Sequence, residues 1–161
     1  RVDLGSATLE VVHTPGHTLG SICIYLREAK VLLTGDTVLG LGSTALNPEE
    51  GDLGLYLASL QRLLAYDIAL LLPGHGPVVK DGRGKIHGLI QHRLEREEQV
   101  LRALQGGPQG VEQLLQEIYP ELEPHLQPLA RSQLRSHLVK LLREGRVAEA
   151  GGTYRFLGGK G

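Results

Sequence analysis

Three short motifs, each directly after an apolar run, constrain this chain more than any other feature. Each motif supplies one strong metal-ligand candidate, and the three candidates are His17, Asp36 and His75. The motifs read HTPGHTLGS at residues 13–21, TGDT at 34–37 and PGHG at 73–76. Because short apolar runs are typical of buried strands, we expect the three side chains to meet at one edge of a sheet. Two imidazoles and one carboxylate suit zinc better than a hard ion such as calcium.

The residue pattern predicts strands giving way to helices. Apolar and alternating runs predict strands at 8–13, 21–26, 30–34 and 68–72. Helical spacing of leucines after residue 52 predicts a helix with Asp52 as its N-cap. A longer amphipathic helix is expected over 85–104, with one apolar side made of Ile86, Ile90, Leu94, Leu101 and Leu104. The run GGPQG then breaks the helix, so we expect one domain over 1–105 and another over 106–161.

The second predicted domain is small and helical. Helical spacing predicts helices over 111–119 and 131–144, the latter burying Leu142 among other leucines. Pro120, Pro124 and Pro128 predict only short turns between them. Residues 146–150 and 153–157 are expected to pair as a hairpin around Gly151-Gly152. Two helices followed by a hairpin resemble a winged-helix module.

The three motifs resemble the second half of the metallo-β-lactamase superfamily, which includes glyoxalase II and β-lactamase-like endoribonucleases. The resemblance implies an α/β (α+β) fold: the second half of a four-layer αββα sandwich, followed by a winged-helix-like domain. It also implies two metal ions, with His17, Asp36 and His75 among their ligands; zinc is expected, and iron or manganese also suit these ligands. The family's HxHxDH motif is absent from the 161 residues. We therefore expect a longer protein whose N-terminal half is the natural partner of this chain.

The resemblance implies a metal-dependent hydrolase in which metal-bound hydroxide attacks an ester, a thioester or a phosphodiester, in a small molecule or in RNA. Asp36 is the expected catalytic residue, because one carboxylate can bridge two metal ions. Three ligands cannot complete two ions, so the chain alone is expected to be inactive. The alternative is a non-catalytic fragment whose winged helix binds nucleic acid or a protein partner.

Three further side chains near the motifs have alternative interpretations. His13 is expected to orient the site from outside or to pack at the strand end, rather than to bind metal. Thr37 either steadies Asp36 through its hydroxyl or merely closes the turn. Cys23 is predicted to be a small core residue without a lowered thiol pKa.

Two groups of basic side chains are candidates for contacts with anions. His92, Arg93 and Arg96 could bind an anionic part of a substrate, or form a solvated face that pairs with neighbouring glutamates. Non-core positions of the 131–144 helix carry further basic residues, with His137 nearby, and these could contact phosphates or dock on protein. They are Arg131, Arg135, Lys140 and Arg143.

The composition of the chain limits its possible binding partners and its possible location. Eighteen acidic against 17 basic residues give no global attraction to nucleic acid or to membranes. One cysteine excludes an internal disulfide framework, and no apolar run approaches the length of a membrane span. A cytoplasmic location is the default expectation, and the sequence makes no prediction of oligomeric state.

Overall fold

The computed structural model describes residues 1–3, 5 and 7–158, which divide into two compact units. The first unit comprises residues 1–45 and 50–91, and the second comprises 46–49 and the chain from residue 92 onward. Helix α2, Gly82–Gln105, contributes to both units. The predicted domain boundary at residue 105 therefore falls later than the division between the units, because the second half of α2 packs into the core of the second unit.

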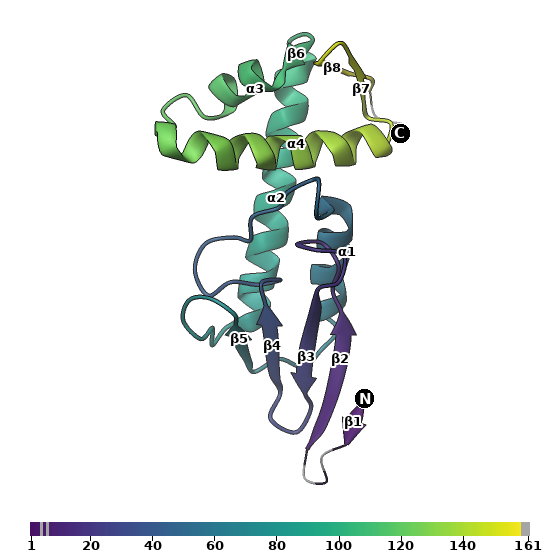
Figure 1. Cartoon of the computed structure of the whole chain (residues 1–161), viewed down its shortest axis with the longest axis vertical. Helices are drawn as coiled ribbons and strands as arrows, with labels where there is room; N and C mark the ends of the chain where they lie inside the picture. The colour runs from purple at the N-terminus through teal and green to yellow at the C-terminus, as the bar shows by residue number, and fades with distance from the viewer. Residues whose placement is uncertain (4, 6, 159–161) are drawn as a thin grey trace. The chain divides into compact units, whose positions relative to one another are not determined.

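The first unit is built on a five-stranded sheet with the order β1-β2-β3-β4-β5 (Figure 1). The strands are β1 Val2–Asp3, β2 Thr8–His13, β3 Ile22–Leu26, β4 Val31–Gly35 and β5 Leu70–Pro73. Neighbours from β1 to β4 are antiparallel, whereas β4 and β5 are parallel and are connected through helix α1, Leu53–Leu63. Since β4 and β5 run in the same direction, the segments that follow them leave from the same edge of the sheet. The four predicted strands are present, with ends that differ by at most two residues.

Helices cover one face of this sheet. Alternate residues on neighbouring strands, such as Val12, Cys23 and Leu32, are at most 4% exposed. Helix α1 and the beginning of α2 lie on the same side of the sheet (Figure 1). Asp52 caps α1 as predicted, since its side chain accepts a hydrogen bond from the backbone N–H of Leu55 at 2.8 Å. The first unit thus consists of one sheet and one helical layer.

The other face of the sheet exposes apolar side chains. Val11 on β2 pairs with Ile24 on β3, which pairs with Leu33 on β4, so these three residues share one face. Val11 is 50% exposed and Leu33 is 36% exposed. An antiparallel pattern of this kind normally places polar residues on a solvated face. Within the described residues, this face therefore has the composition of a packing surface.

The second unit combines the end of α2 with two further helices and a small sheet. Its elements are β6 Gln109–Gly110, α3 Val111–Ile118, a short 3-10 helix Pro124–Leu126, α4 Gln127–Arg143, β7 Val147–Ala150 and β8 Thr153–Phe156. The sheet has the order β6-β8-β7. Leucines from three helices share one core, among them Leu104, Leu114, Leu134 and Leu138. Two helices and a hairpin in this order match the predicted winged-helix arrangement.

Two predictions about these helices were wrong. Helix α4 begins at Gln127 rather than at residue 131, with Pro128 in its first turn, where a missing backbone N–H breaks no helical hydrogen bond. Leu94 is 45% exposed and does not belong to the buried side of α2. That side instead passes through Arg93 and Glu97, which are 3% and 5% exposed. Charged residues can lie on the buried side of a helix when they are paired with other polar groups. A pattern of apolar residues does not predict such a buried side.

One milder difference concerns a side chain of α4. Leu142 is half-buried rather than buried, although it packs against the second core. In the part of the chain that the structure describes, no helix is both long enough and apolar enough to cross a membrane.

Candidate metal centre

His17 lies on a tight loop between β2 and β3. The loop is closed by hydrogen bonds from the Thr14 N–H to the Ser21 carbonyl at 2.9 Å and from the Gly16 N–H to the Thr18 carbonyl at 3.0 Å. A Cβ atom at residue 16 would lie 2.4 Å from Tyr56 Cα on helix α1, so only glycine fits there. The loop that carries His17 is therefore pressed directly against the backbone of α1.

Asp36 and His75 follow the two parallel strands β4 and β5. Gly35 has a φ of 50°, a left-handed conformation that glycine adopts readily, and it turns the chain at Asp36. The Gly74 N–H donates to the Gly35 carbonyl at 2.8 Å, so the segment before His75 is tied to the segment before Asp36. The sheet ladder thus continues by one hydrogen bond up to the candidate ligands.

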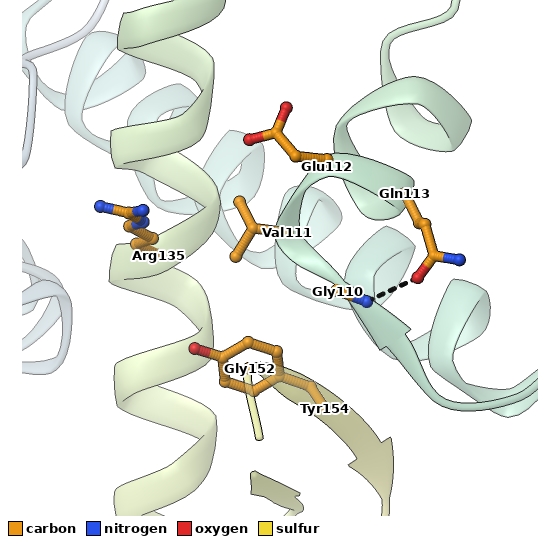
Figure 2. Close-up of a pocket in the computed structure, with 7 residues that line it drawn as sticks. All are labelled: Gly110, Val111, Glu112, Gln113, Arg135, Gly152 and Tyr154. Atoms are coloured by element: carbon orange, nitrogen blue, oxygen red, sulfur yellow. Dashed lines mark hydrogen bonds between the residues drawn. The ribbon is translucent and has the colours of Figure 1, made fainter. Parts of the chain in front are cut away.

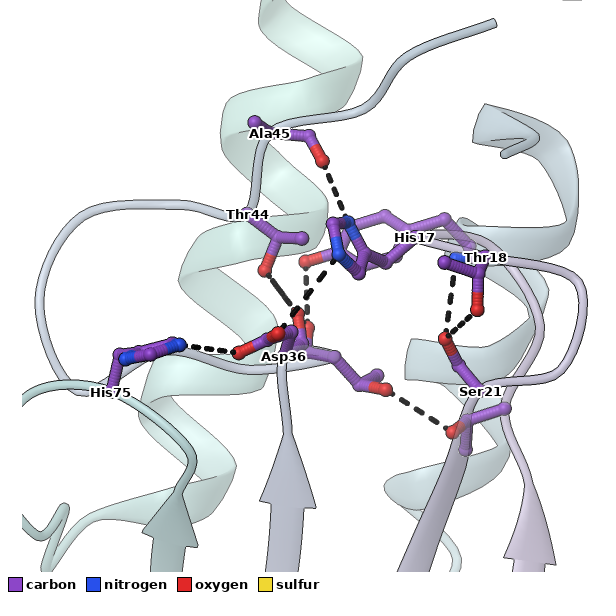
Figure 3. Close-up of polar contacts among 10 residues, drawn as sticks. His17, Thr18, Ser21, Asp36, Thr44, Ala45 and His75 are labelled. Carbon is purple, nitrogen blue, oxygen red and sulfur yellow. Dashed lines mark hydrogen bonds and ion pairs between the residues drawn. The ribbon is translucent and has the colours of Figure 1, made fainter. Parts of the chain in front are cut away.

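The three candidate ligands meet as predicted, with Asp36 between the two histidines (Figure 3). His17 Nε2 lies 4.0 Å from Asp36 Oδ2, and His75 Nε2 lies 3.5 Å from Asp36 Oδ1. Each carboxylate oxygen thus faces a different imidazole. This arrangement is the one expected of a carboxylate that gives one oxygen to each of two ions.

The donor atoms of these three residues have the chemistry that a metal site requires. Asp36 Oδ1 is buried and accepts no hydrogen bond within the described residues, which is costly for a carboxylate oxygen unless a cation or a donor completes it. The Asp36 side chain as a whole is 42% exposed, so the remaining part of the carboxylate is open. Among residues 1–3, 5 and 7–158, no three histidine, cysteine, aspartate or glutamate side chains surround a single ion position.

His17 is oriented by a backbone carbonyl. Its Nδ1 lies 2.9 Å from the Ala45 carbonyl oxygen, and because a carbonyl can only accept, Nδ1 carries the proton. The lone pair of the neutral ring is then on Nε2, the atom that faces Asp36 (Figure 3). Metal-binding histidines commonly donate their second ring N–H in this way.

Thr44 anchors the turn that carries Asp36. The Thr44 hydroxyl lies 2.7 Å from the Asp36 carbonyl oxygen and 3.3 Å from that of Thr37, and the residue is 2% exposed. The Thr37 carbonyl also accepts a hydrogen bond from the Tyr56 hydroxyl at 3.0 Å. The hydroxyl of Thr37 itself contacts that of Thr14 at 3.2 Å, and its N–H closes the turn to Thr34. Of the two interpretations of Thr37, the structure supports turn closure.

The other side chains beside the motifs have structural contacts. His13 Nε2 donates to the Leu19 carbonyl at 2.9 Å and so braces the loop that carries His17. Cys23 is fully buried, and burial raises the pKa of its thiol despite hydrogen bonds with Thr14 and Thr37. A buried thiol with a raised pKa is a poor nucleophile.

Comparison with known proteins identifies both units. Residues 1–75 match the model of the metallo-beta-lactamase superfamily, and residues 111–155 match the beta-lactamase associated winged helix domain. A beta-lactamase domain protein from Burkholderia ambifaria has a similar structure, with a TM-score of 0.83 and 28% identity; the match covers 96% of this chain and 50% of that one. This chain carries a metallo-beta-lactamase superfamily domain. A winged helix domain follows it.

Curated relatives are similar over the first domain and match only part of their own length. An atrochrysone carboxyl ACP thioesterase from Paecilomyces divaricatus is 43% identical over 98 residues, which cover 61% of this chain and 30% of the relative. A beta-lactamase-like protein 2 homolog from Caenorhabditis elegans is 36% identical over 103 residues, or 64% of this chain and 34% of the relative. The chain therefore spans about a third of the length of these relatives. One of these relatives is named a thioesterase and the other a beta-lactamase-like protein. These names support a hydrolase-type superfamily.

The predicted anion contacts His92, Arg93 and Arg96 lie in the winged helix unit and have different surroundings. Arg93 is 3% exposed and donates a hydrogen bond to the Gln133 side chain. The Arg96 guanidinium lies 4.7 Å from the centre of the Tyr119 ring. His92 is exposed, and partial burial followed by the charges of Arg93 and Arg96 lowers its pKa. The first unit, which contains the metal-ligand candidates, includes none of the three.

The basic residues of α4 are largely engaged in ion pairs. Arg131 donates to both carboxylate oxygens of Glu112, at 2.6 and 2.9 Å. The Lys140 side chain is only 14% exposed, and its Nζ lies 2.7 Å from Glu97 and 2.8 Å from Glu144. Burial lowers the pKa of Lys140, but hydrogen bonds to these two glutamates outweigh it and leave that pKa raised. Lys140 is therefore a structural cation and not part of an open basic face.

Arg135 is exposed, as is Arg143, and it borders two hollows of the winged helix domain. One has a volume of about 500 Å³ and is bordered by α3, α4 and the β6-β8 edge (Figure 2). Its lining residues are Gly110, Val111, Glu112, Gln113, Arg135, Gly152 and Tyr154. The second hollow, of about 430 Å³, adjoins residues 47–49. Neither hollow contains a candidate metal ligand.

Sequence reasoning missed the residues that hold the ligands in place. Ala45 acts through its backbone carbonyl, and every residue type has one, so no pattern of side chains could reveal it. Thr44 and Tyr56 act through hydroxyls on segments outside the three motifs. The only signal available was the position of Thr44 in a glycine-rich segment shortly after TGDT.

Proposed function

We propose that the chain forms one side of a dinuclear metal site and that the complete protein is a metal-dependent hydrolase. The observation that carries this proposal is the placement of Asp36, whose two oxygens face His75 and His17 separately. Two imidazoles and one carboxylate that held a single ion would converge on one point, whereas here the two imidazoles face different oxygens of Asp36. Asp36 Oδ1 is buried and accepts no hydrogen bond from the residues that the structure describes, which supports the same interpretation.

In this proposal the chain's own residues have defined roles. His17 and His75 would each offer Nε2 to one ion, Asp36 would bridge the two ions, and the Ala45 carbonyl would keep the proton of His17 on Nδ1. When bound, such ions polarise a carbonyl or phosphoryl oxygen and lower the pKa of water to about 7. We propose zinc as the metal, while iron and manganese also suit these ligands.

For the substrate we propose a thioester or an ester. The support is the relative at 43% identity, which is named an acyl carrier protein thioesterase. A phosphodiester, as in RNA, is the remaining possibility within this chemistry. Because the fold hosts many reactions, the choice among these substrates rests on resemblance and not on the geometry of the site.

We further propose that the exposed apolar face of the sheet packs against the sheet of an N-terminal half. Val11, Ile24 and Leu33 form the centre of that face, and two sheets that pack face to face require such complementary apolar surfaces. The match with the solved protein from Burkholderia ambifaria covers only 50% of that chain. The other half of such a protein could supply the second sheet, which supports this proposal. The remaining metal ligands would lie on that half, so the 161 residues alone should have no appreciable activity.

The experiment is a zinc titration of the chain and of the complete protein, with Asp36→Ala and Asp36→Asn as test variants. Asp67→Asn is the matched control, because it removes an exposed carboxylate that pairs with Lys30. Lys30 precedes β4, whereas Asp36 follows the other end of that strand. We expect about two ions in the complete protein, a loss of at least tenfold in zinc affinity for both Asp36 variants, and loss of hydrolysis with the fold retained. Hydrolysis by the folded Asp36→Ala protein would refute the proposal.

For the winged helix domain we propose packing on protein rather than on nucleic acid. The ion pairs of Arg131 and Lys140 support this choice. Binding to phosphates requires free basic side chains that can replace the counterions of the nucleic acid. Leu126 and Leu129, which are 40% and 49% exposed at the start of α4, supply an apolar contact surface. Tight binding of an RNA oligonucleotide with an affinity that falls steeply as salt rises, and is weakened by Arg135→Ala, would contradict this assignment.

A further inference from the structure

Helix α1 holds the loop that carries His17, and both belong to the first unit. The Ser59 hydroxyl donates a hydrogen bond to the Pro15 carbonyl at 2.8 Å, two residues before His17. The backbone N–H of Asp52, the N-cap of α1, donates to the Gly16 carbonyl at 2.8 Å. Ser59 is 1% exposed, so water does not compete freely for its hydroxyl. The residues before His17 are therefore fixed to α1.

The same helix holds the turn that carries Asp36. The Tyr56 hydroxyl donates to the carbonyl of Thr37, directly after Asp36, at 3.0 Å. Tyr56 is fully buried, and its backbone abuts Gly16, where a Cβ atom would lie 2.4 Å from Tyr56 Cα. Residues three apart, such as Tyr56 and Ser59, lie on one side of a helix, about 4.5 Å apart along its axis. One side of α1 thus contacts the loops of two candidate metal ligands.

Helix α1 is itself placed by the core of the first unit. Leu53, Leu60 and Leu63 are at most 3% exposed, and burial of each leucine side chain contributes about 1.5 to 3 kcal/mol. Side chains on a packed helix are positioned more precisely than side chains on loops. The helix is therefore a rigid support that sets the spacing between the two loops it contacts.

His75 is held in a different way. The Gly74 N–H donates to the Gly35 carbonyl at 2.8 Å, and the Gly40 N–H donates to the His75 carbonyl at 2.9 Å. These contacts attach the His75 segment to the chain on either side of Asp36, in continuation of the pairing between β4 and β5. The placement of His75 relative to Asp36 therefore depends on the sheet, whereas that of His17 relative to Asp36 depends on α1.

We infer that Tyr56 and Ser59 are positioning residues that set the placement of His17 relative to Asp36. The inference rests on the proposed function in treating His17 and Asp36 as metal ligands. Without the two hydroxyls, the loops lose donors that tie them to one support. His17 then moves relative to the carboxylate that it faces and to the Ala45 carbonyl that keeps the proton of its ring on Nδ1.

The test is NMR of the imidazole nitrogens in the 161-residue chain, first without metal and then during a zinc titration. The double variant Y56F/S59A removes both hydroxyls. In the metal-free chain we expect the His17 ring to lose part of its Nδ1–H tautomer, while the His75 ring stays unchanged. The zinc affinity reported by His17 should fall by about tenfold or more, as for other groups that orient ligands, and that reported by His75 should stay near the wild-type value. A general loss of structure would affect both rings.

Tyr25→Phe is the matched control. Tyr25 is 5% exposed, and its hydroxyl donates to the Asp67 carbonyl at 2.7 Å. The substitution also removes a tyrosine hydroxyl from a backbone carbonyl of the first unit, but Asp67 precedes β5, whereas His75 follows the other end of that strand. Its His17 and His75 spectra should match those of the wild type. Ser59→Thr keeps a hydroxyl and should retain the wild-type response of His17.

The single variants keep the test decisive if Y56F/S59A does not fold, because Tyr56→Phe and Ser59→Ala each remove only one oxygen atom. Ser59→Ala should have the larger effect, since the Thr37 carbonyl keeps a second donor, the Thr44 hydroxyl at 3.3 Å. A response at His17 alone supports the inference.

Unchanged His17 spectra in the folded variants, or changes of equal size at His17 and His75, overturn the positioning role. If the wild-type chain and the complete protein bind no zinc, the proposed function alone is refuted, because the metal-free spectra still decide whether Tyr56 and Ser59 position His17.

Discussion

His137 on helix α4 should make the winged helix domain sensitive to acid. Its side chain is 2% exposed, and within the described residues neither ring nitrogen has a hydrogen-bond partner. Burial, together with the positive charges of Arg93, Lys140, His92 and Arg96, lowers the pKa of His137 from 6.5 to about 3. The folded domain therefore contains a neutral histidine that the unfolded chain would protonate readily.

The size of the effect follows from this difference in pKa. Because the folded pKa lies below the unfolded one, the unfolded state binds the additional proton, and stability falls as the pH decreases below 6.5. Each pKa unit is equivalent to about 1.4 kcal/mol, so the full interval down to a pKa of about 3 corresponds to a loss of roughly 4 to 5 kcal/mol. At a pH two units below the unfolded pKa, the expected loss is roughly 2.7 kcal/mol. A small domain is stable by only about 5 to 15 kcal/mol.

The assay is urea unfolding of the wild type and of His137→Leu, at about neutral pH and at a pH two units below 6.5. Leucine does not titrate, so the free-energy difference between variant and wild type should move by roughly 2.7 kcal/mol in favour of the variant. His125→Leu removes an exposed histidine beside Glu123 and should follow the wild type. If the wild type and His137→Leu lose the same free energy on acidification, His137 is not a neutral buried group.

Three other substitutions test the packing and the caps. Gly16→Ala should destabilise the chain by roughly 2 to 3 kcal/mol in thermal unfolding, because the new Cβ would lie 2.4 Å from Tyr56 Cα. Gly20→Ala is the control, because its Cβ enters open space and should change the stability little. Glu97→Leu leaves Lys140 and Arg146 without the carboxylate that they share. The substitution should lower the free energy of unfolding in urea by about 3 to 5 kcal/mol. An unchanged unfolding midpoint would mean that these ion pairs are unimportant for stability. Asp52→Ala removes the cap of α1 and should cost about 1 kcal/mol, while Asp52→Asn should retain most of it.

Local patterns were sufficient to predict most of the first domain. The strand at 8–13 was predicted with the ends it has in the structure, since its side chains alternate and a proline follows it. The meeting of His17, Asp36 and His75 could be predicted because each ligand follows a strand, and the sheet topology then brings the strand ends to one edge. The directions of the strands are sufficient for this prediction.

Features that depend on packing were beyond sequence reasoning. An exposed Leu94 and a buried Glu97 invert the usual preference, and only the positions of Lys140 and Arg146 explain why Glu97 can be buried. The same pairing removed Lys140 from the basic face that the sequence predicted. Charges that are partnered across elements cannot be distinguished from solvated charges along a single helix.

The parallel pairing of β4 and β5 has a consequence for how this site can diverge. Asp36 and His75 follow neighbouring hydrogen-bonded strands, and neighbouring strands lie about 4.8 Å apart in any sheet. Their separation is therefore inherited from backbone geometry and is insensitive to substitution elsewhere. His17 comes from the antiparallel part of the sheet and depends on a loop carbonyl for its orientation. In the proposed metal site, divergence in the preferred metal should accordingly arise through the segment around Ala45, while the positions of Asp36 and His75 stay constant.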